Sequence, residues 1–412
     1  MPDSSAMAPA RPTQAARTKR RVLLAAVAAA LALRGGAARA GTDVVRVGYL
    51  RTTARRPTLS LLDQQAADDG LAGAKLAMDD NATTGRLMGQ TFTLLDAPVP
   101  PGGDPVAALR SLQSQGAALL LSDLPADALL RLADATADGG ITLFNIAAPD
   151  DALRGAQCRA RIIHVAPSRF MLADAVAQYL VWKKWTHWLL AVGSHPEDEL
   201  LAAAYRRAAK RFGARIVQER IFKDTGGARQ TDSGVVQTQQ QMPVFTQEAP
   251  DYDVLVAADE NEVFAGDLPY RTWDARPVAG SAGLRPETWD AASDSWGGAQ
   301  LQSRFTRLFH RRMSALDMQA WTAARMIGEA ASRTHATDAA TLVAYMRSPE
   351  FGVAAYKGQR LTVRDWDGQL RQPILLADGR SVVSISPQPG FLHPVTELDT
   401  LGADRPESQC VH

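Results

Sequence analysis

Short runs of β-branched and apolar residues alternate along this chain with longer stretches of helical periodicity, and this alternation constrains the fold more than any other feature. Helical patterns at Gly70–Asn81, Asp104–Gln115 and Pro125–Ala137 separate four expected strands, which are Val44–Leu50, Thr91–Leu95, Ala117–Leu121 and Ile141–Ile146. Runs such as AALLL at 117–121 lack polar positions. Such runs are typical of a parallel sheet that helices cover on both faces.

The alternation begins again after residue 168. This second part is expected to contain the helices Phe170–Trp182 and Glu197–Phe212 and the strands His187–Val192, Ala214–Phe222, Tyr252–Ala257 and Pro277–Gly280. Gly213 follows the second helix, where glycine is favoured as the residue just past the C-terminus. Residues 224–250 are polar and rich in Gln and Gly, so we expect no more than one short helix there.

The last third of the chain has a different pattern. It is expected to contain the helices Phe305–Phe309, Ala320–Thr334 and Ala339–Arg347, then short β runs at Gln359–Arg364, Gln372–Leu376 and Ser381–Ile385. Asp367-Gly368 and Asp378-Gly379 separate the β runs, as is typical of hairpins. The tail from Pro387 is expected to be irregular. Because 412 residues exceed the usual size of one hydrophobic core, the pattern predicts a two-domain α/β protein.

The first forty residues have the pattern of a secretory signal peptide. Basic residues between Arg11 and Arg21 precede an apolar run, Val22–Leu33, and small residues follow at Ala38 and Ala40. The apolar run is shorter than the roughly twenty residues that span a bilayer. We therefore expect cleavage after Ala40 and export to the periplasm; the alternative is an N-terminal anchor that stays uncleaved.

Charge and cysteine content narrow the possible partners. Without residues 1–40 the chain keeps 38 basic and 43 acidic residues, a formal charge of −5, which argues against nucleic acid or an anionic membrane as partner. The two cysteines are Cys158 and Cys410. In an oxidising compartment they are expected to form a disulfide, and the alternative is two free thiols.

No catalytic or metal-binding motif occurs in the sequence. The nucleophile elbow G-x-S-x-G, the phosphate loop, H-E-x-x-H and a G-x-G-x-x-G after the first strand are all missing, and the seven histidines lack ligand spacing. We therefore predict no catalytic residue, no metal site and no cofactor. An enzyme stays a third alternative, because catalytic groups can converge in space from distant positions.

Several segments resemble type I periplasmic binding proteins of the Leu/Ile/Val-binding kind. Gly73–Ala82 (GAKLAMDDNA), followed by Gly85, Gly89, Leu94 and Asp96, is similar to the opening of that family. Further similarity is found at Arg161–Ser168, Ala320–Ala331 and Gly358–Leu370.

The resemblance implies a two-lobed type I periplasmic-binding-protein fold, in which each lobe is a mostly parallel sheet flanked by helices. Lobe 1 would comprise residues 41–160 and 283–357, lobe 2 residues 161–282 and 358–390, and a C-terminal tail residues 391–412. It also implies a monomeric periplasmic substrate-binding component of an ABC-type transporter. Its partners would be a small polar solute, bound between the lobes, and the membrane subunits of the transporter.

One branch of that family is more similar still. Four segments resemble the binding proteins associated with PQQ-dependent alcohol dehydrogenase systems, namely Leu268–Trp273, Arg276–Gly280, Trp296–Gln302 and Glu397–Gly402. This resemblance implies a link to periplasmic alcohol oxidation, without implying that the chain binds the quinone. The alternative within this setting is a non-transport periplasmic sensor or accessory protein of the dehydrogenase system.

Ligands of open α/β sheets bind outside the carboxyl ends of the strands, which nominates residues in five loops. Asp123 would repel a ligand carboxylate, although it could instead cap the following helix. A neutral or cationic polar solute is therefore expected rather than an α-amino acid. Asp259 and Glu260, in the loop after the strand Tyr252–Ala257, would likewise suit an amine or hydroxyl groups. The candidate ligand-binding residues are Thr52, Thr53, Ser122, Asp123, Ala147, Ala148, Ser194, His195, Asp259 and Glu260.

Overall fold

Five strands from the first part of the chain form one sheet in the order β2-β1-β3-β4-β5. The strands are β1 (Asp43–Thr52), β2 (Gln90–Val99), β3 (Leu119–Asp123), β4 (Thr142–Asn145) and β5 (Ile162–His164). β1 pairs in parallel with β3, β3 with β4, and β4 with β5. The computed structural model describes residues 43–53, 65–137, 139–224 and 237–411, so the predicted signal peptide lies outside the described residues.

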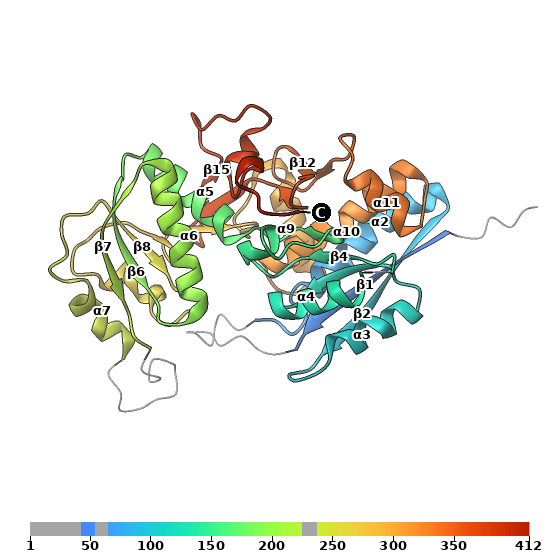
Figure 1. The fold of residues 1–412 in the computed structure, drawn as a ribbon, viewed down its shortest axis with the longest axis horizontal. Helices are drawn as coiled ribbons and strands as arrows, with labels where there is room; N and C mark the ends of the chain where they lie inside the picture. Colours follow the sequence, from blue (N-terminus) through green and yellow to red (C-terminus); the bar gives the residue numbers. More distant parts are fainter. Residues whose placement is uncertain (1–42, 54–64, 138, 225–236, 412) are drawn as a thin grey trace, which may run out of the picture. The chain divides into compact units, whose positions relative to one another are not determined.

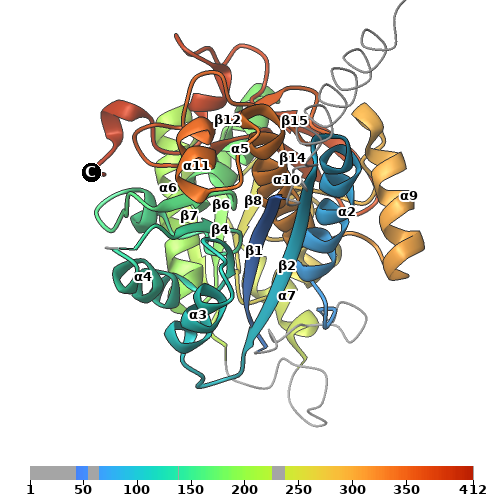
Figure 2. The ribbon, with the colours of Figure 1, turned by 90° about the vertical axis from the view of Figure 1, so that its right-hand side faces the viewer.

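Each face of this sheet has its own apolar core, because successive side chains of a strand point to opposite faces. Leu119 and Leu121 of β3 pack with the buried side of one helix group, whereas Leu120 between them packs with another. The first group is α2 (Leu71–Met88), α9 (Gly298–Phe309), α10 (Ala315–Thr334) and α11 (Ala339–Met346); the second is α3 (Pro105–Ser114) and α4 (Ala126–Ala135). Figure 2 shows α2 and α10 on one side of β1, and α3 and α4 on the other.

A second parallel sheet follows in the order β7-β6-β8-β9. Trp188 and Leu190 of β6 face one helix layer, and Leu189 faces the other. In Figure 1, α6 lies along one face of this sheet, with α7 on the other side. The elements are β6 (His187–Val192), β7 (Arg215–Ile221), β8 (Val254–Ala258) and β9 (Val278–Gly280), with α5 (Arg169–Trp182), α6 (Pro196–Phe212), α7 (Thr238–Thr246) and α8 (Leu268–Arg271).

Antiparallel strands form the two small remaining sheets. β10 (Arg285–Glu287), β14 (Ile374–Ala377) and β15 (Val382–Ser386) make one; β11 (Val353–Ala354), β12 (Arg360–Val363) and β13 (Leu370–Arg371) make the other. β12 pairs with β13 around Asp367-Gly368, and β14 with β15 around Asp378-Gly379. The predicted hairpin at Asp378-Gly379 is therefore confirmed. At Asp367-Gly368 a hairpin also forms, but its second strand is Leu370–Arg371, because the expected run Gln372–Leu376 contributes to β14, which pairs with β10 and β15.

The C-terminal tail is fixed to the rest of the molecule. Cys158 and Cys410 form the predicted disulfide, with Cα atoms 5.5 Å apart. The buried carboxylate of Asp399 accepts hydrogen bonds from Arg364 and Arg371, and the backbone N–H of Gly402 donates to Asp174. The tail was expected to be irregular, and it contains two 3₁₀ helices, η5 (Glu397–Thr400) and η6 (Arg405–Glu407).

Element types agree with the sequence predictions, but some boundaries were wrong. α2 continues seven residues beyond its predicted end at Asn81, because the Asn81 amide is buried and donates to the Ala324 carbonyl of α10. α9 begins seven residues before the predicted helix Phe305–Phe309, because the polar residues of its first two turns show no clear apolar periodicity. The segment 224–250 holds one short helix among its described residues, α7. In the part of the chain described, no helix combines the length and the apolar content needed to cross a membrane.

Candidate functional site

Two of the nominated residues, Ser122 and Asp123, are not loop residues. They are the last two residues of β3, which ends two residues later than predicted, and pair with Leu50 and Arg51 of β1. Ser122 is fully buried and Asp123 is 5% exposed. The side-chain oxygen of Ser122 has no hydrogen-bond partner among the described residues. Pro125, rather than Asp123, is the N-cap of α4, so the capping alternative is also wrong.

The other nominated residues of the first sheet mainly hold their own loops. The backbone N–H and the hydroxyl of Thr53 both donate to the Val99 carbonyl of β2, while Thr52 ends β1. After β4, the amide of Asn145 receives the backbone N–H groups of Ala147 and Ala148 and donates to the Ala148 carbonyl. These backbone groups are therefore occupied by bonds within the loop.

A buried carboxylate, Asp198, joins two loops at the carboxyl end of the second sheet. Its Oδ2 accepts the N–H of His195, and its Oδ1 accepts the N–H groups of Glu260 and Asn261 at 2.7 and 3.1 Å. A β-carbon on Gly193 would lie 2.1 Å from Asp198 Oδ2, so this position requires glycine. Asp198 thus links the loop after β6 to the loop after β8.

Ser194 and His195 both contact Asp224, which follows β7. The backbone N–H of Asp224 donates to the Ser194 hydroxyl, and His195 Nε2 lies 2.8 Å from an Asp224 carboxylate oxygen. The hydrogen bond with Asp224 raises the pKa of His195. These two predicted residues are therefore brought together, at the junction of the loops after β6 and β7.

Asp259 organises the loop after β8. Its carboxylate accepts the backbone N–H groups of Val263, Phe264 and Ala265 at 2.9, 2.7 and 2.7 Å. Burial raises the pKa of Asp259, and the three N–H groups oppose that shift. The Asp259 side chain therefore holds the backbone of its own loop, because its carboxylate already accepts three backbone N–H groups.

Arg169, at the start of α5, links the ends of the two sheets. It is 4% exposed in its side chain and binds Glu260 through two hydrogen bonds of 2.6 and 2.7 Å. Its Nη1 also lies 3.0 Å from Asp150, in the loop that follows β4. Glu260 is consequently paired with an arginine in this structure, which the sequence did not predict.

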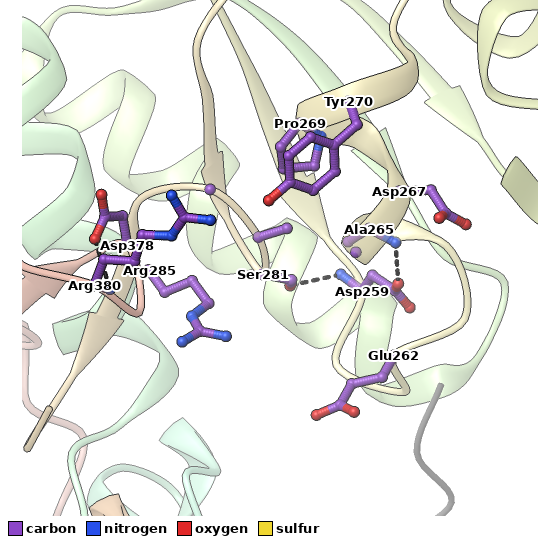
Figure 3. A pocket seen from close by; sticks show the side chains of 13 residues that line it. Asp259, Glu262, Ala265, Asp267, Pro269, Tyr270, Ser281, Arg285, Asp378 and Arg380 are labelled. Atoms are coloured by element: carbon purple, nitrogen blue, oxygen red, sulfur yellow. Dashed lines mark hydrogen bonds between the residues drawn. The ribbon is translucent and has the colours of Figure 1, made fainter. Parts of the chain in front are cut away.

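An open pocket of about 770 Å³ lies beside the carboxyl ends of β8 and β9. Figure 3 shows the guanidinium groups of Arg285 and Arg380 on one side and the carboxylates of Glu262 and Asp267 on the other. Ser281 lies between the two sides, and its hydroxyl oxygen accepts the backbone N–H of Asp259. The remaining lining residues are Ala265, Gly266, Pro269, Tyr270, Ala282, Gly283 and Asp378.

The acidic groups of the pocket differ in their surroundings. Burial raises the pKa of Asp267, whereas the backbone N–H groups of Arg380 and Ser381 lower the pKa of Asp378. The backbone N–H groups therefore favour the charged form of Asp378, whereas burial disfavours the charged form of Asp267. Among the described residues no group of three or more His, Cys, Asp or Glu side chains is arranged to hold a metal ion.

Of the ten nominated residues, Asp259 alone lines this pocket. The sequence reasoning missed the two arginines and Tyr270. Two signals were present: the Asp378-Gly379 hairpin, whose turn carries Arg380, and the segment Leu268–Trp273, which contains Tyr270. Neither signal indicated that the two segments line one pocket. Arg285 lies on the same side as Arg380 because β10 pairs with β14, a pairing between strands far apart in the sequence.

The fold corresponds to a known class of protein. Residues 61–243 match a family model described as periplasmic binding protein. The expected type I periplasmic-binding-protein fold, with parallel sheets flanked by helices, is confirmed. No protein of curated function matches the sequence.

Among solved structures, the chain is similar to a branched chain amino acid ABC transporter periplasmic ligand-binding protein from Burkholderia xenovorans, at 17% identity and a TM-score of 0.68, covering 89% of this chain and 99% of that one. A periplasmic binding protein from Burkholderia mallei is 16% identical with a TM-score of 0.61, covering 90% and 99%. An ABC-transporter solute binding protein from R. palustris, in complex with benzoate, is 13% identical with a TM-score of 0.62, covering 89% and 99%. At these identities the likeness establishes the fold.

Proposed function

We propose that this protein is the periplasmic solute-binding component of an ABC-type transporter and binds a small polar solute without chemically changing it. The observation that carries the proposal is the pocket beside the carboxyl ends of β8 and β9. In open α/β sheets this edge is where ligands bind. The match of residues 61–243 to periplasmic binding proteins supports the same function.

The finer parts of the proposal rest on the sequence. The protein would be a monomer, exported with cleavage after Ala40. Lobe 1 would comprise residues 41–160 and 283–357, and lobe 2 residues 161–282 and 358–390. Residues 391–412 would form the C-terminal tail. The solute would lie between the lobes, near the ten nominated residues. Its macromolecular partners would be the membrane subunits of the transporter.

A link to PQQ-dependent alcohol oxidation is a separate part of the proposal, and sequence segments such as Leu268–Trp273 support it. Within that link, the second candidate function is a non-transport sensor or accessory protein of the dehydrogenase system. Tyr270 and Trp273 of this segment are 82% and 62% exposed. Exposed aromatic side chains of this kind are suited to contact either a ligand or a partner protein.

A thermal-shift screen of the mature protein against alcohols, aldehydes, acids, amines and amino acids tests the binding function. A solute present at one hundred times its Kd should raise the free energy of unfolding by about 2.7 kcal/mol. For a protein of this size, that corresponds to an increase in Tm of about 3 °C. Tyr270→Ala should weaken binding, whereas the control Arg215→Gln, an exposed change on β7, should leave it unchanged. A flat screen with folded protein contradicts the proposal.

Two further measurements separate the alternatives. Co-purification of ABC-transporter membrane subunits from detergent-solubilised membranes supports transport, whereas recovery of a periplasmic dehydrogenase supports the accessory function. Any solute that binds is then recovered and analysed by mass spectrometry. Chemical conversion of that solute would support an enzyme instead.

A further inference from the structure

We propose that a second ligand site, separate from the pocket beside β8 and β9, binds a saccharide ring on the exposed indole of Trp296. An open pocket of about 780 Å³ is lined by residues of η4 (Ser295–Gly297), of α10 and of the hairpin that joins β11 to β12. Among the described residues, the two pockets have no lining residue in common. The inference therefore goes beyond the proposed function, which concerns the other pocket.

The second pocket lies away from the sheet edge at which open α/β proteins bind ligands. Two of its lining residues, Glu329 and Arg333, belong to the last two turns of α10. This end of α10 lies beside the beginning of β2, because the side chain of Gln90 donates to the Ala331 carbonyl at 3.1 Å. β1 and β2 end together at the opposite edge, where the backbone N–H of Thr53 donates to the Val99 carbonyl.

The indole of Trp296 presents one of its faces to solvent. A β-carbon on Gly358 would lie 2.4 Å from Cε2 and 2.6 Å from Cζ2 of Trp296. Cε2 belongs to both rings of the indole and has no open edge, so the backbone of Gly358 lies against a ring face. Trp296 is nevertheless 55% exposed, and the opposite face is therefore the one that a ligand can reach.

The backbone around this contact has an unusual conformation. Trp296 has a φ of +48° and Tyr356 a φ of +55°, in the left-handed region that large side chains rarely occupy. Gly297 has a φ of +85°, and a β-carbon there would lie 3.3 Å from the Tyr356 ring. Burial does not account for the conformation of Trp296, because more than half of this residue stays exposed. Strained residues of this kind concentrate at ligand-binding sites.

The groups around the indole can both donate and accept hydrogen bonds. Nε of Arg333 donates to Oε1 of Glu329 at 2.8 Å, and no hydrogen bond within the described residues occupies Oε2. The Gln359 amide and the Tyr345 hydroxyl belong to residues that line the same pocket, and neither makes a hydrogen bond in the described part of the chain. The indole N–H of Trp296 is a further donor.

The charges that line the pocket balance one another. Two glutamates and two arginines line it, and Glu329 and Arg333 form an ion pair. Lys357 also lines the pocket, but its buried ammonium group donates to the Gln372 side chain at 2.8 Å and to the Pro373 carbonyl. An anionic or cationic ligand would therefore gain little, whereas a neutral ligand with many hydroxyl groups finds both donors and acceptors.

A pyranose ring combines these properties with a surface that suits the indole. When its hydroxyl groups are equatorial, axial C–H groups cover each ring face and can contact the negative face of an aromatic ring. The equatorial hydroxyl groups then point outward to the polar groups around Trp296. A proline-rich peptide can also pack on an indole, but its proline residues lack N–H donors for the carboxylate of Glu329.

Calorimetric titration of the mature protein tests this inference. The probes are cellobiose, cellotetraose and chitotetraose, whose rings carry equatorial substituents, and sorbitol, which has similar hydroxyl groups but no ring. We expect at least one of the saccharides to bind and sorbitol not to bind. Trp296→Ala should weaken saccharide binding by at least about tenfold, and Trp296→Phe should restore part of the affinity. The matched control is Trp182→Ala, which removes a tryptophan that is 45% exposed on α5 and should leave the affinity unchanged.

Circular dichroism checks the fold of each variant. Should Trp296→Ala not fold, Gln359→Ala, an exposed change in the same pocket, decides instead, and full affinity in that variant overturns the inference. Failure of all three saccharides to bind, equal affinity for sorbitol, or full affinity in folded Trp296→Ala also overturns it. So does binding of a proline-rich peptide in place of the saccharides.

The variant Tyr270→Ala separates this inference from the proposed function. It changes the pocket beside β8 and β9 and should leave saccharide affinity unchanged. Loss of saccharide binding in Tyr270→Ala, with full affinity in Trp296→Ala, would place the saccharide in that other pocket. This result overturns the second site and leaves the proposed function standing.

Discussion

Removing the disulfide should lower the stability of the protein without changing its fold. The perturbation is the double change Cys158→Ser and Cys410→Ser. The two cysteines are 252 residues apart, and for such a loop the chain-entropy model gives about 5.5 kcal/mol as an upper value. Measured values are more commonly 2–4 kcal/mol. The tail should stay docked in the variant, because Asp399 and Gly402 hold it through hydrogen bonds.

The expected change in Tm follows from the length of the chain. An unfolding entropy of about 2.1 cal/mol/K per residue over roughly 370 residues gives about 0.8 kcal/mol/K. A loss of about 2–5 kcal/mol therefore lowers Tm by about 3–6 °C. Differential scanning calorimetry measures this shift, with and without a phosphine reductant. The reductant should lower Tm of the parent to the value of the double variant and should not change the variant.

Two results would refute this reasoning. One is an unchanged Tm in the parent after reduction, with both thiols shown to be free by alkylation and mass spectrometry. The other is a loss of the native circular dichroism spectrum in the double variant at 25 °C. The second result would mean that the disulfide, rather than the hydrogen bonds of Asp399, holds the tail in place.

Three further changes test the loops and the buried charges. Gly193→Ala should destabilise the protein by about 1–3 kcal/mol, because its β-carbon would lie 2.1 Å from Asp198. Arg169→Gln should cost about 2–4 kcal/mol, since it leaves two carboxylates without their shared cation. Burial lowers the pKa of Lys357 to about 7 from 10.5 in the unfolded chain. Between pH of about 7 and 10.5 the unfolded chain therefore binds more protons than the folded protein. The free energy of unfolding of the parent should rise with pH in this range by up to about 1.4 kcal/mol per pH unit, and Lys357→Met should lack this rise.

Urea unfolding measures all three, and each has a control. Gly140→Ala adds a β-carbon with no atom within 4 Å and should change stability little, so equal effects at 140 and 193 would contradict the steric argument. Arg169→Lys should recover part of the loss, because it restores the charge but not the two-point contact with Glu260. Parallel pH profiles for the parent and Lys357→Met would show that Lys357 is not the group responsible.

The order of strands and helices could be predicted from the sequence because it depends on local periodicity. The hairpin at Asp378-Gly379 depends on a two-residue signal, and the disulfide on there being only two cysteines. The errors in boundaries arose where a polar residue is buried. Asn81 looked like a helix end and Ser122 like a loop residue, but the amide of Asn81 bonds to another helix and Ser122 lies inside the sheet.

The site was less predictable for a different reason. The sequence placed most of the nominated residues after strands, although Ser122 and Asp123 belong to β3 itself, and the role of such a side chain depends on partners distant in the chain. Glu260 pairs with Arg169 across 91 residues, and Asp259 binds the backbone of its own loop. Arg285 and Arg380 meet through the β10–β14 register, which no local pattern encodes.

The way Asp198 and Asp259 hold their loops has a consequence for how this protein could change its specificity. Both carboxylates bind backbone N–H groups, so the shape of the loop after β8 depends little on which side chains project from it. Glu262, Tyr270 and Arg380 line the pocket without being part of that frame. These three positions could therefore diverge during evolution, or be randomised to build a biosensor for another metabolite, while the loop after β8 keeps its conformation.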